Sequence, residues 1–211
     1  MGPSAGRAGD RGGFVTRRAL VALVLVAIIA LSGWREKLFI VQKPGAGPVP
    51  LVLLAESERL PAEFDATLAA VPVGSERLSP GGGVMVVHYW APWERHSGEQ
   101  ARGLDSLRRA LPPGSVRIAV VCFDPFPSVA RYVARLRLRL PVLLDQRHVL
   151  SDRLPCPSIP FTYVIDRRGR IAVAQAGEVD WLAPATRESL ERLHGEAAPA
   201  KPLEPGRRTA S

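Results

Sequence analysis

The stretch that decides the fold of this chain is "VMVVHYWAPWERHSGEQARGLDSLRRAL", residues 84–111. It opens with a continuous apolar run, Val84–Trp90, whose β-branched residues predict a buried strand. Leucines then recur at positions 104, 107 and 111, on one face of a helix that begins at Ser97. A strand that leads directly into a helix is the first half of a βαβ unit, so we expect the next strand to pair with it in parallel.

The same alternation of strands and helices continues to His194. Short apolar runs bounded by turn residues predict strands, and longer periodic segments predict helices. The expected elements are a strand over Val116–Asp124, a helix over Pro127–Leu140, a short strand or extended segment over 141–145, two strands within 161–177 and a final helix over 180–194. The last two strands flank an Asp-Arg-Arg-Gly turn and predict a hairpin. The sequence therefore predicts an α/β domain whose mixed sheet has an antiparallel edge.

Three segments resemble landmarks of one protein family. "WAPWERHS", Trp90–Ser97, is similar to the thioredoxin superfamily signature W-A-x-W-C-x-x-C. "SIPFTYVIDRRGRI", residues 158–171, resembles the cis-proline motif of that superfamily, and residues 123–145 resemble the intervening helix and strand of its membrane-anchored, extracytoplasmic TlpA/ResA-like (redoxin) branch. The resemblance covers roughly residues 60–194. It implies a thioredoxin-like fold, a mixed central sheet flanked by helices, and a cis bond between Ile159 and Pro160.

The two redox cysteines of that family are missing from this chain. The family's first cysteine attacks a disulfide as a thiolate that the helix N-terminus stabilises, and the second resolves the mixed disulfide. Their positions hold Glu94 and Ser97, with Arg95 and His96 between them. Neither Glu94 nor Ser97 can form a disulfide, although both suit a helix N-terminus. The family's buried acidic residue corresponds to His88, which we expect to be a buried titratable group.

The leading hypothesis is a redox-inactive thioredoxin-like domain that binds another extracytoplasmic protein or peptide. In the family, the motif helix and the cis-proline loop frame a groove for an extended polypeptide, and backbone groups beside the proline can bind a peptide without thiol chemistry. The expected groove residues are Trp90, Trp93, Glu94, Arg95, His96, Ser97, Ile159 and Pro160. No catalytic residue and no cofactor are expected on this hypothesis.

Two alternatives stay open. The first is a thiol oxidoreductase or peroxidase-like redoxin that acts through a single cysteine, Cys156, four residues before Pro160. The second treats the domain as a spacer with no affinity in its groove. Cys122 lies in an apolar strand and is expected in the core, and the sequence leaves open whether Cys122 and Cys156 pair.

Other chemistries find little support in the sequence. His88, Glu94 and His96 are close in the chain, but their spacing fits no metal motif, so no metal is expected. The formal net charge is +8, carried mainly by arginines that are spread along the chain. No aromatic residues interleave with these basic residues, so a solvated surface is favoured over a nucleic-acid interface.

The chain ends suggest how the domain is placed. Residues 1–18 are rich in Gly and Arg and predict a disordered cytoplasmic N-terminus, and 195–211 predict a disordered tail. Residues 19–41 contain an uncharged apolar run, which predicts a single-pass membrane anchor or, alternatively, a cleaved signal. Arginines before the run place the following domain in the periplasm or outside the cell. Residues 42–59 are expected to be a linker and 60–194 the thioredoxin-like domain.

Overall fold

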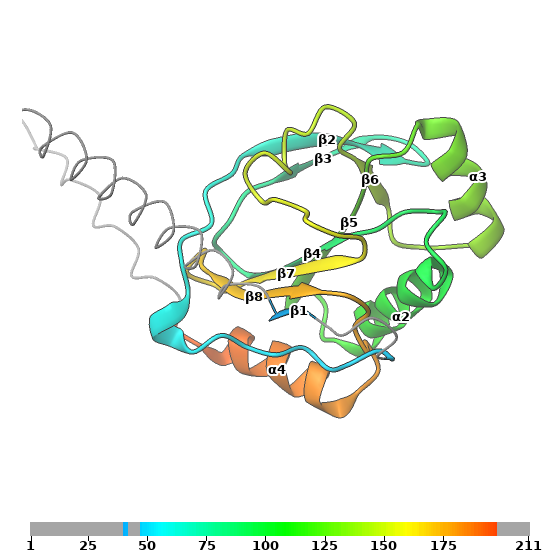
Figure 1. Cartoon of the computed structure of the whole chain (residues 1–211). Helices are drawn as coiled ribbons and strands as arrows, with labels where there is room; N and C mark the ends of the chain where they lie inside the picture. The colour runs from blue at the N-terminus through cyan, green and yellow to red at the C-terminus, as the bar shows by residue number, and fades with distance from the viewer. Residues whose placement is uncertain (1–39, 42–46, 198–211) are drawn as a thin grey trace, which may run out of the picture. The chain divides into compact units, whose positions relative to one another are not determined.

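The structure, a computed structural model, describes residues 40–41 and 47–197 (Figure 1). Its elements in chain order are β1 (Ile40–Val41), the 3₁₀ turn η1 (Glu56–Glu58), β2 (Ala66–Val71), β3 (Ser75–Leu78), β4 (Val84–Tyr89), α2 (Ser97–Ala110), β5 (Val116–Cys122), α3 (Phe126–Leu136), β6 (Val142–Leu144), β7 (Phe161–Ile165), β8 (Ile171–Ala176) and α4 (Pro184–Gly195). The strands form one sheet in the order β1-β8-β7-β4-β5-β6-β2-β3.

The sheet is mixed, as predicted. β4, β5 and β6 pair in parallel, with Val84 opposite Val116 and Tyr89 opposite Val121. β7 pairs antiparallel with both β4 and β8, and β7 and β8 form the predicted hairpin. Gly169 closes that hairpin with φ 76°, a left-handed conformation that glycine adopts without steric cost.

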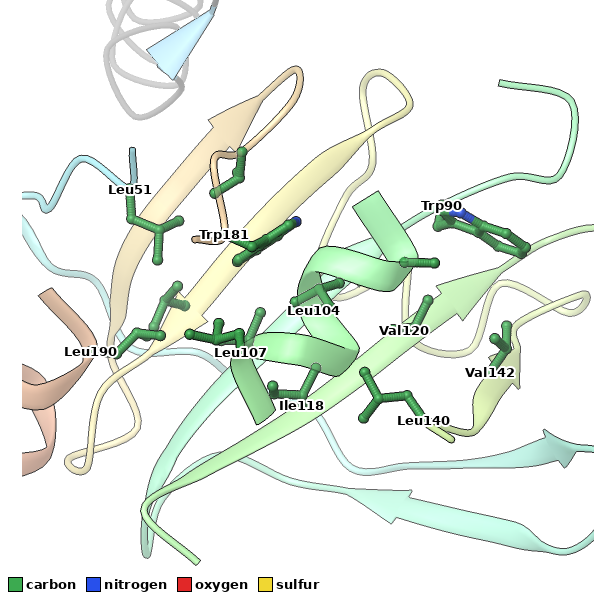
Figure 2. Close-up of a cluster of buried hydrophobic side chains, with 14 of the residues drawn as sticks. Leu51, Trp90, Leu104, Leu107, Ile118, Val120, Leu140, Val142, Trp181 and Leu190 are labelled. Carbon is green, nitrogen blue, oxygen red and sulfur yellow. The ribbon is translucent and has the colours of Figure 1, made fainter. Parts of the chain in front are cut away.

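One face of the sheet packs against α2, α3 and α4. In β4 and β5 the even-numbered residues point toward this face. Their apolar side chains form a single hydrophobic cluster with side chains of the three helices. Figure 2 shows Leu104 and Leu107 of α2 beside Ile118 and Val120 of β5. Leu104 is fully buried, so its replacement by alanine is expected to cost about 2–5 kcal/mol.

The other face of the sheet is covered by the segment between β6 and β7. Leu150 and Leu154 of this segment are buried. Two tyrosines on the sheet hold it: Tyr89 Oη donates to the Leu154 carbonyl at 2.8 Å, and Tyr163 Oη donates to the Pro155 carbonyl at 2.6 Å. The segment that leads to Pro160 therefore lies directly on the strand that carries the motif.

The structure corrects several predicted boundaries. The helix predicted to reach Leu140 ends at Leu136, because Arg137 takes a left-handed conformation with φ 53°. The β2–β3 hairpin was not predicted, since "ATLAAV" has the weak strand propensity of an alanine-rich segment. Residues 47–59, which the sequence placed in the linker, pack on the domain, with Leu51 in the core and Val49 bridged to Val179.

The predicted anchor region is only partly described. Its last two residues form β1, which pairs in parallel with β8, with Ile40 opposite Gln175. The rest of the predicted segment, 19–39, lies outside the described residues, as does the predicted tail 1–18. Of the predicted tail 195–211, residues 198–211 also lie outside them, and Gly195 is the last residue of α4. Among the residues that the structure does describe, no helix has the length and apolar character needed to span a membrane.

Candidate functional site

The fold brings the motif and the proline loop to one end of the sheet. Tyr89, the last residue of β4, lies opposite Phe161, the first residue of β7. The motif segment follows Tyr89, and the Ile159–Pro160 bond precedes Phe161. The two therefore meet at the same end of the sheet. The bond is cis, as the resemblance implied, and the Pro160 carbonyl accepts a hydrogen bond from the Gly177 amide at 2.9 Å.

Glu94 stabilises the start of α2 from the position of the family's first cysteine. The His96 backbone N–H donates to both carboxylate oxygens of Glu94, at 3.1 Å to Oε1 and 3.0 Å to Oε2. The first amides of a helix have no partner inside the helix, and a negative charge beside them interacts favourably with the helix dipole. The carboxylate is therefore engaged in a structural hydrogen bond.

Ser97 joins α2 to α3 from the position of the second cysteine. Its side chain is fully buried, and its hydroxyl lies 2.7 Å from the Tyr132 hydroxyl. The Ser97 carbonyl also accepts a hydrogen bond from Trp90 Nε1 at 2.8 Å, and the Trp90 and Tyr132 rings pack edge to face. Gly98 permits this approach, since a Cβ there would lie 3.2 Å from Tyr132 Oη.

The predicted groove residues separate into two layers. Trp90 and Ser97 are buried beneath the motif and do not reach the surface, and Pro160 is also buried. Trp93 is 69% exposed, Arg95 is exposed, and Glu94, His96 and Ile159 are partly exposed. Trp90, Ser97 and Pro160, which the sequence placed in the groove, are therefore buried residues beneath it and not exposed contact surface. The Trp90 indole N–H and the Ser97 hydroxyl form their hydrogen bonds inside the fold.

His96 carries charge partners on two elements. Its Nδ1 lies 3.4 Å from Glu99 Oε2 on the same helix, and its Nε2 lies 3.8 Å from Glu178 Oε1 in the turn after β8. His96 therefore lies between a carboxylate of α2 and a carboxylate of the turn after β8.

His88 is fully buried under the motif. Its Nδ1 lies 3.0 Å from Thr162 Oγ1, and its ring meets Trp181 edge to face. Its Nε2 has no hydrogen-bond partner within the described part of the chain. Burial lowers the pKa of His88 to about 3, so the imidazole is neutral at physiological pH.

Gln100 is a site-supporting residue that sequence reasoning missed. Its Nε2 donates to the Val179 carbonyl at 3.0 Å, while its Oε1 accepts from the Val179 amide at 3.2 Å and from Trp181 Nε1 at 2.8 Å. These bonds attach the turn after β8 to the first turns of α2. A signal was present, because position 100 falls on the same helical face as Leu104 and Leu107.

Both cysteines are free thiols. Cys122 is buried, and its sulfur lies 3.5 Å from Asp124 Oδ2. Cys156 is partly exposed, and its thiol donates to the Ser158 carbonyl at 3.0 Å. Burial raises the pKa of each thiol to about 12. Thiolate is the nucleophilic form of cysteine, so neither thiol is activated at neutral pH.

No metal centre emerges from the geometry of the described residues. In that part of the chain, no three His, Cys, Asp or Glu side chains gather in a way that would hold an ion. The described His88 and His96 lie on different elements, one inside β4 and one at the start of α2.

Comparison with solved structures identifies the fold class. The chain matches no family model and no curated protein. It is similar to a putative thiol:disulfide interchange protein DsbE from Chlorobium tepidum, with 19% identity, a TM-score of 0.54, and coverage of 64% of this chain and 94% of that one. It is similar to StoA from Bacillus subtilis, with 18% identity, a TM-score of 0.53, and coverage of 63% and 98%.

A third similar structure is the pneumococcal exposed lipoprotein thioredoxin Etrx1 from Streptococcus pneumoniae. It shares 21% identity, with a TM-score of 0.53 and coverage of 61% of this chain and 98% of that one. The chain therefore has the thioredoxin-like fold, and the resemblance read from its motifs is confirmed at the level of the fold. At these identities the likeness concerns the fold, and the activity must be argued from the site.

Proposed function

We propose that this protein is a thioredoxin-like binding module without dithiol chemistry, which holds an extended segment of another extracytoplasmic protein beside Trp93. One observation carries the proposal. The two positions of the family's cysteines hold Glu94 and Ser97, whose side chains fasten the motif helix, while the adjacent Trp93 is 69% exposed. The site keeps its shape without a nucleophile and presents a large aromatic surface.

The surface beside Trp93 suits a polypeptide partner. Exposed tryptophan combines a large apolar area with a polar N–H and is enriched among residues that dominate binding energy. The backbone N–H and C=O of Ile159 make no hydrogen bond to any described residue, so both can pair with an added extended strand. Glu94, Arg95 and His96 then supply charged groups at the rim of the contact.

The proposed location is outside the cytoplasm, on an N-terminal anchor within residues 19–39. Arginines before that apolar run favour this orientation. The fold is also that of Etrx1, an exposed lipoprotein thioredoxin. A secreted form that follows cleavage of the same segment is the alternative.

The single-cysteine alternative is less well supported by the geometry. It requires a thiolate at Cys156, but burial raises the pKa of that thiol to about 12 and the S–H is engaged with Ser158. Very little thiolate is then present at pH 7.

The redox part of the proposal is tested by insulin-disulfide reduction with dithiothreitol as the electron source. We expect the full-length protein to be inactive and a Glu94→Cys/Ser97→Cys variant to be active, because the double variant restores both thiols at the helix start. Turnover by the unchanged protein that disappears in Cys156→Ser would instead establish a one-cysteine enzyme.

The binding part is tested with an unfolded, thiol-blocked polypeptide such as carboxymethylated ribonuclease A. We expect Trp93→Ala to weaken its binding by about tenfold or more, the effect of losing a central aromatic contact. Val73→Ala is the matched control, because Val73 is 84% exposed in the β2–β3 turn at the opposite end of the sheet. Equal affinities for both variants would contradict the proposed surface.

A further inference from the structure

A second concave site lies at the end of the sheet opposite the motif. A cavity of about 590 Å³ opens between the last turn of α2, the turn at 112–114, the start of β5 and the residues that precede β6. The motif follows the carboxyl end of β4, whereas this cavity adjoins the amino end of the parallel strand β5. Its volume falls within the usual range for sites of small organic ligands.

The floor of this cavity is apolar. Leu111, Ile118 and Leu140 line it and belong to the main hydrophobic cluster, with exposed fractions of 6%, 7% and 3%. Figure 2 shows Ile118 and Leu140 next to each other at this end of the core. An apolar group that enters the cavity therefore meets side chains already held in place by the core.

The rim of the cavity is basic. Arg109 pairs with Asp105 at 3.1 Å, and Arg117 pairs with Glu76 at 2.9 Å and with the Arg77 carbonyl. Arg108 also lines the cavity, and no described carboxylate pairs with it. Two of the three lining arginines are thus paired with carboxylates, and Arg108 is the lining arginine whose charge no described carboxylate balances.

The chain's own terminal segments do not match this charge. Residues 1–18 contain four arginines and one aspartate, and residues 198–211 contain one lysine, two arginines and one glutamate. A basic rim repels basic segments, so the complementary occupant is an external anion.

We infer that this cavity is a binding site for a phosphate monoester that carries an apolar group. The phosphate lies over Arg108, whose planar guanidinium offers paired donors to phosphate oxygens, and the apolar group lies on Leu111, Ile118 and Leu140. The site shares no residue with the motif surface, so it does not depend on the proposed function.

Calorimetric titration of the full-length protein with 1-naphthyl phosphate, in the uncharged detergent dodecyl maltoside, tests the site. We expect one saturable site per chain and a loss of about tenfold in affinity for Arg108→Gln, because one charge-assisted contact is removed. Arg131→Gln is the matched control: it removes one exposed arginine from α3, outside the cavity, and is expected to bind as the unchanged protein does.

Uncharged 1-naphthyl glucoside and inorganic phosphate each carry one half of the proposed ligand, and both are expected to bind at least tenfold more weakly. The inference is overturned if the glucoside binds as tightly as the phosphate ester, if the two arginine variants behave alike, or if no saturable heat appears. Pro113→Glu, which places a carboxylate on the exposed turn, gives a second test and should also weaken binding.

The same titration separates the two sources of this chemistry. Tighter binding of lysophosphatidic acid than of 1-naphthyl phosphate would identify a lipid phosphate as the ligand. The reverse order would identify a soluble phosphate ester. Both results support the site, provided that Arg108→Gln weakens the preferred ligand.

Discussion

At the scale of single residues, the site is built from side chains that bond to the fold. Glu94 accepts from the His96 amide, and the Ser97 hydroxyl bonds to Tyr132. Each such bond contributes about 0.5–1.5 kcal/mol to folding. Trp93, between the buried Trp90 and the bonded Glu94, is the aromatic side chain of the motif that is exposed to solvent.

His88 should make the stability of the protein fall in acid. Its pKa is about 3 in the folded state, because burial opposes its charge, and about 6.5 when unfolded. Below pH 6.5 the unfolded chain therefore binds a proton that the folded protein excludes, and stability falls as pH drops toward 3. Between about pH 7 and pH 4.5 this contributes a loss of about 2–3 kcal/mol.

The measurement is the free energy of unfolding in urea at both pH values for the unchanged protein and His88→Asn. The variant keeps a hydrogen-bonding group opposite Thr162 and removes the titration. We expect a smaller loss of stability in the variant, and an identical loss in both proteins would contradict the assignment.

At the scale of elements, close contacts between a helix backbone and neighbouring side chains determine how the helix packs. Gly103 of α2 faces Trp181, and a Cβ at this position would lie 3.0 Å from Trp181 Cδ1 and 3.2 Å from Trp181 Cβ. The indole is held by its bond to Gln100, so it cannot move freely. The position therefore requires glycine for space, although glycine weakens a helix interior.

Gly103→Ala should destabilise the protein despite the better helix propensity of alanine. Propensity favours alanine by about 1 kcal/mol, and overpacking opposes it by about 1–3 kcal/mol. The check is the thermal midpoint together with the near-ultraviolet circular dichroism of Trp181. A raised midpoint with an unchanged tryptophan signal would show that the helix and the turn shift at little cost.

A buried arginine attaches the segment before β2 to the β7–β8 turn. Arg59 Nη1 lies 3.3 Å from Asp166 Oδ2 and 2.8 Å from Glu196 Oε2, and the Arg59 and Asp166 side chains are 5% and 0% exposed. Arg170 also pairs with Asp166, through Nε at 2.9 Å. One group of charges therefore joins three distant parts of the chain.

Arg59→Met should lower the free energy of unfolding by about 3 kcal/mol. Removing one partner of a buried ion pair costs about 3–5 kcal/mol, and Arg170 still compensates Asp166, which favours the lower end. Arg77→Met is the control, because the Arg77–Asp65 pair is exposed and should contribute nothing measurable. Urea denaturation of both variants makes the comparison, and equal effects would contradict the role of burial.

At the scale of the whole molecule, the described residues share one main hydrophobic cluster. The residues of the main hydrophobic cluster lie between Leu51 and Leu193. The piece 40–197 should therefore fold alone and melt in one cooperative transition, within a few degrees of the full-length protein. Circular dichroism of the buried Trp90 and Trp181 reports this, and a broad transition without that signal would show that the rest of the chain is needed.

Much of the fold could be predicted because its signals are local. β4, α2, β5 and the β7–β8 hairpin lie where periodicity and the turn at Gly169 placed them. The alanine-rich β2 carries no such signal. Its partner β3 was not predicted, nor was its pairing with β6, the short strand expected within 141–145. The motifs indicated a candidate site at Trp90–Ser97 and Pro160, but they did not predict that Trp90 and Ser97 are buried.

The sequence by itself determined the order of the elements from β4 to α4 and the lack of cysteines at positions 94 and 97, and its resemblance to a known family implied that the motif meets Pro160. The order of these elements and the missing cysteines follow from residue identity, periodicity and short-range turn chemistry. Only the tertiary structure decided that Gln100 holds the turn after β8 and that Arg108 faces an apolar cavity. Both depend on contacts between segments far apart in the chain, which no local pattern encodes because packing selects them after the elements assemble.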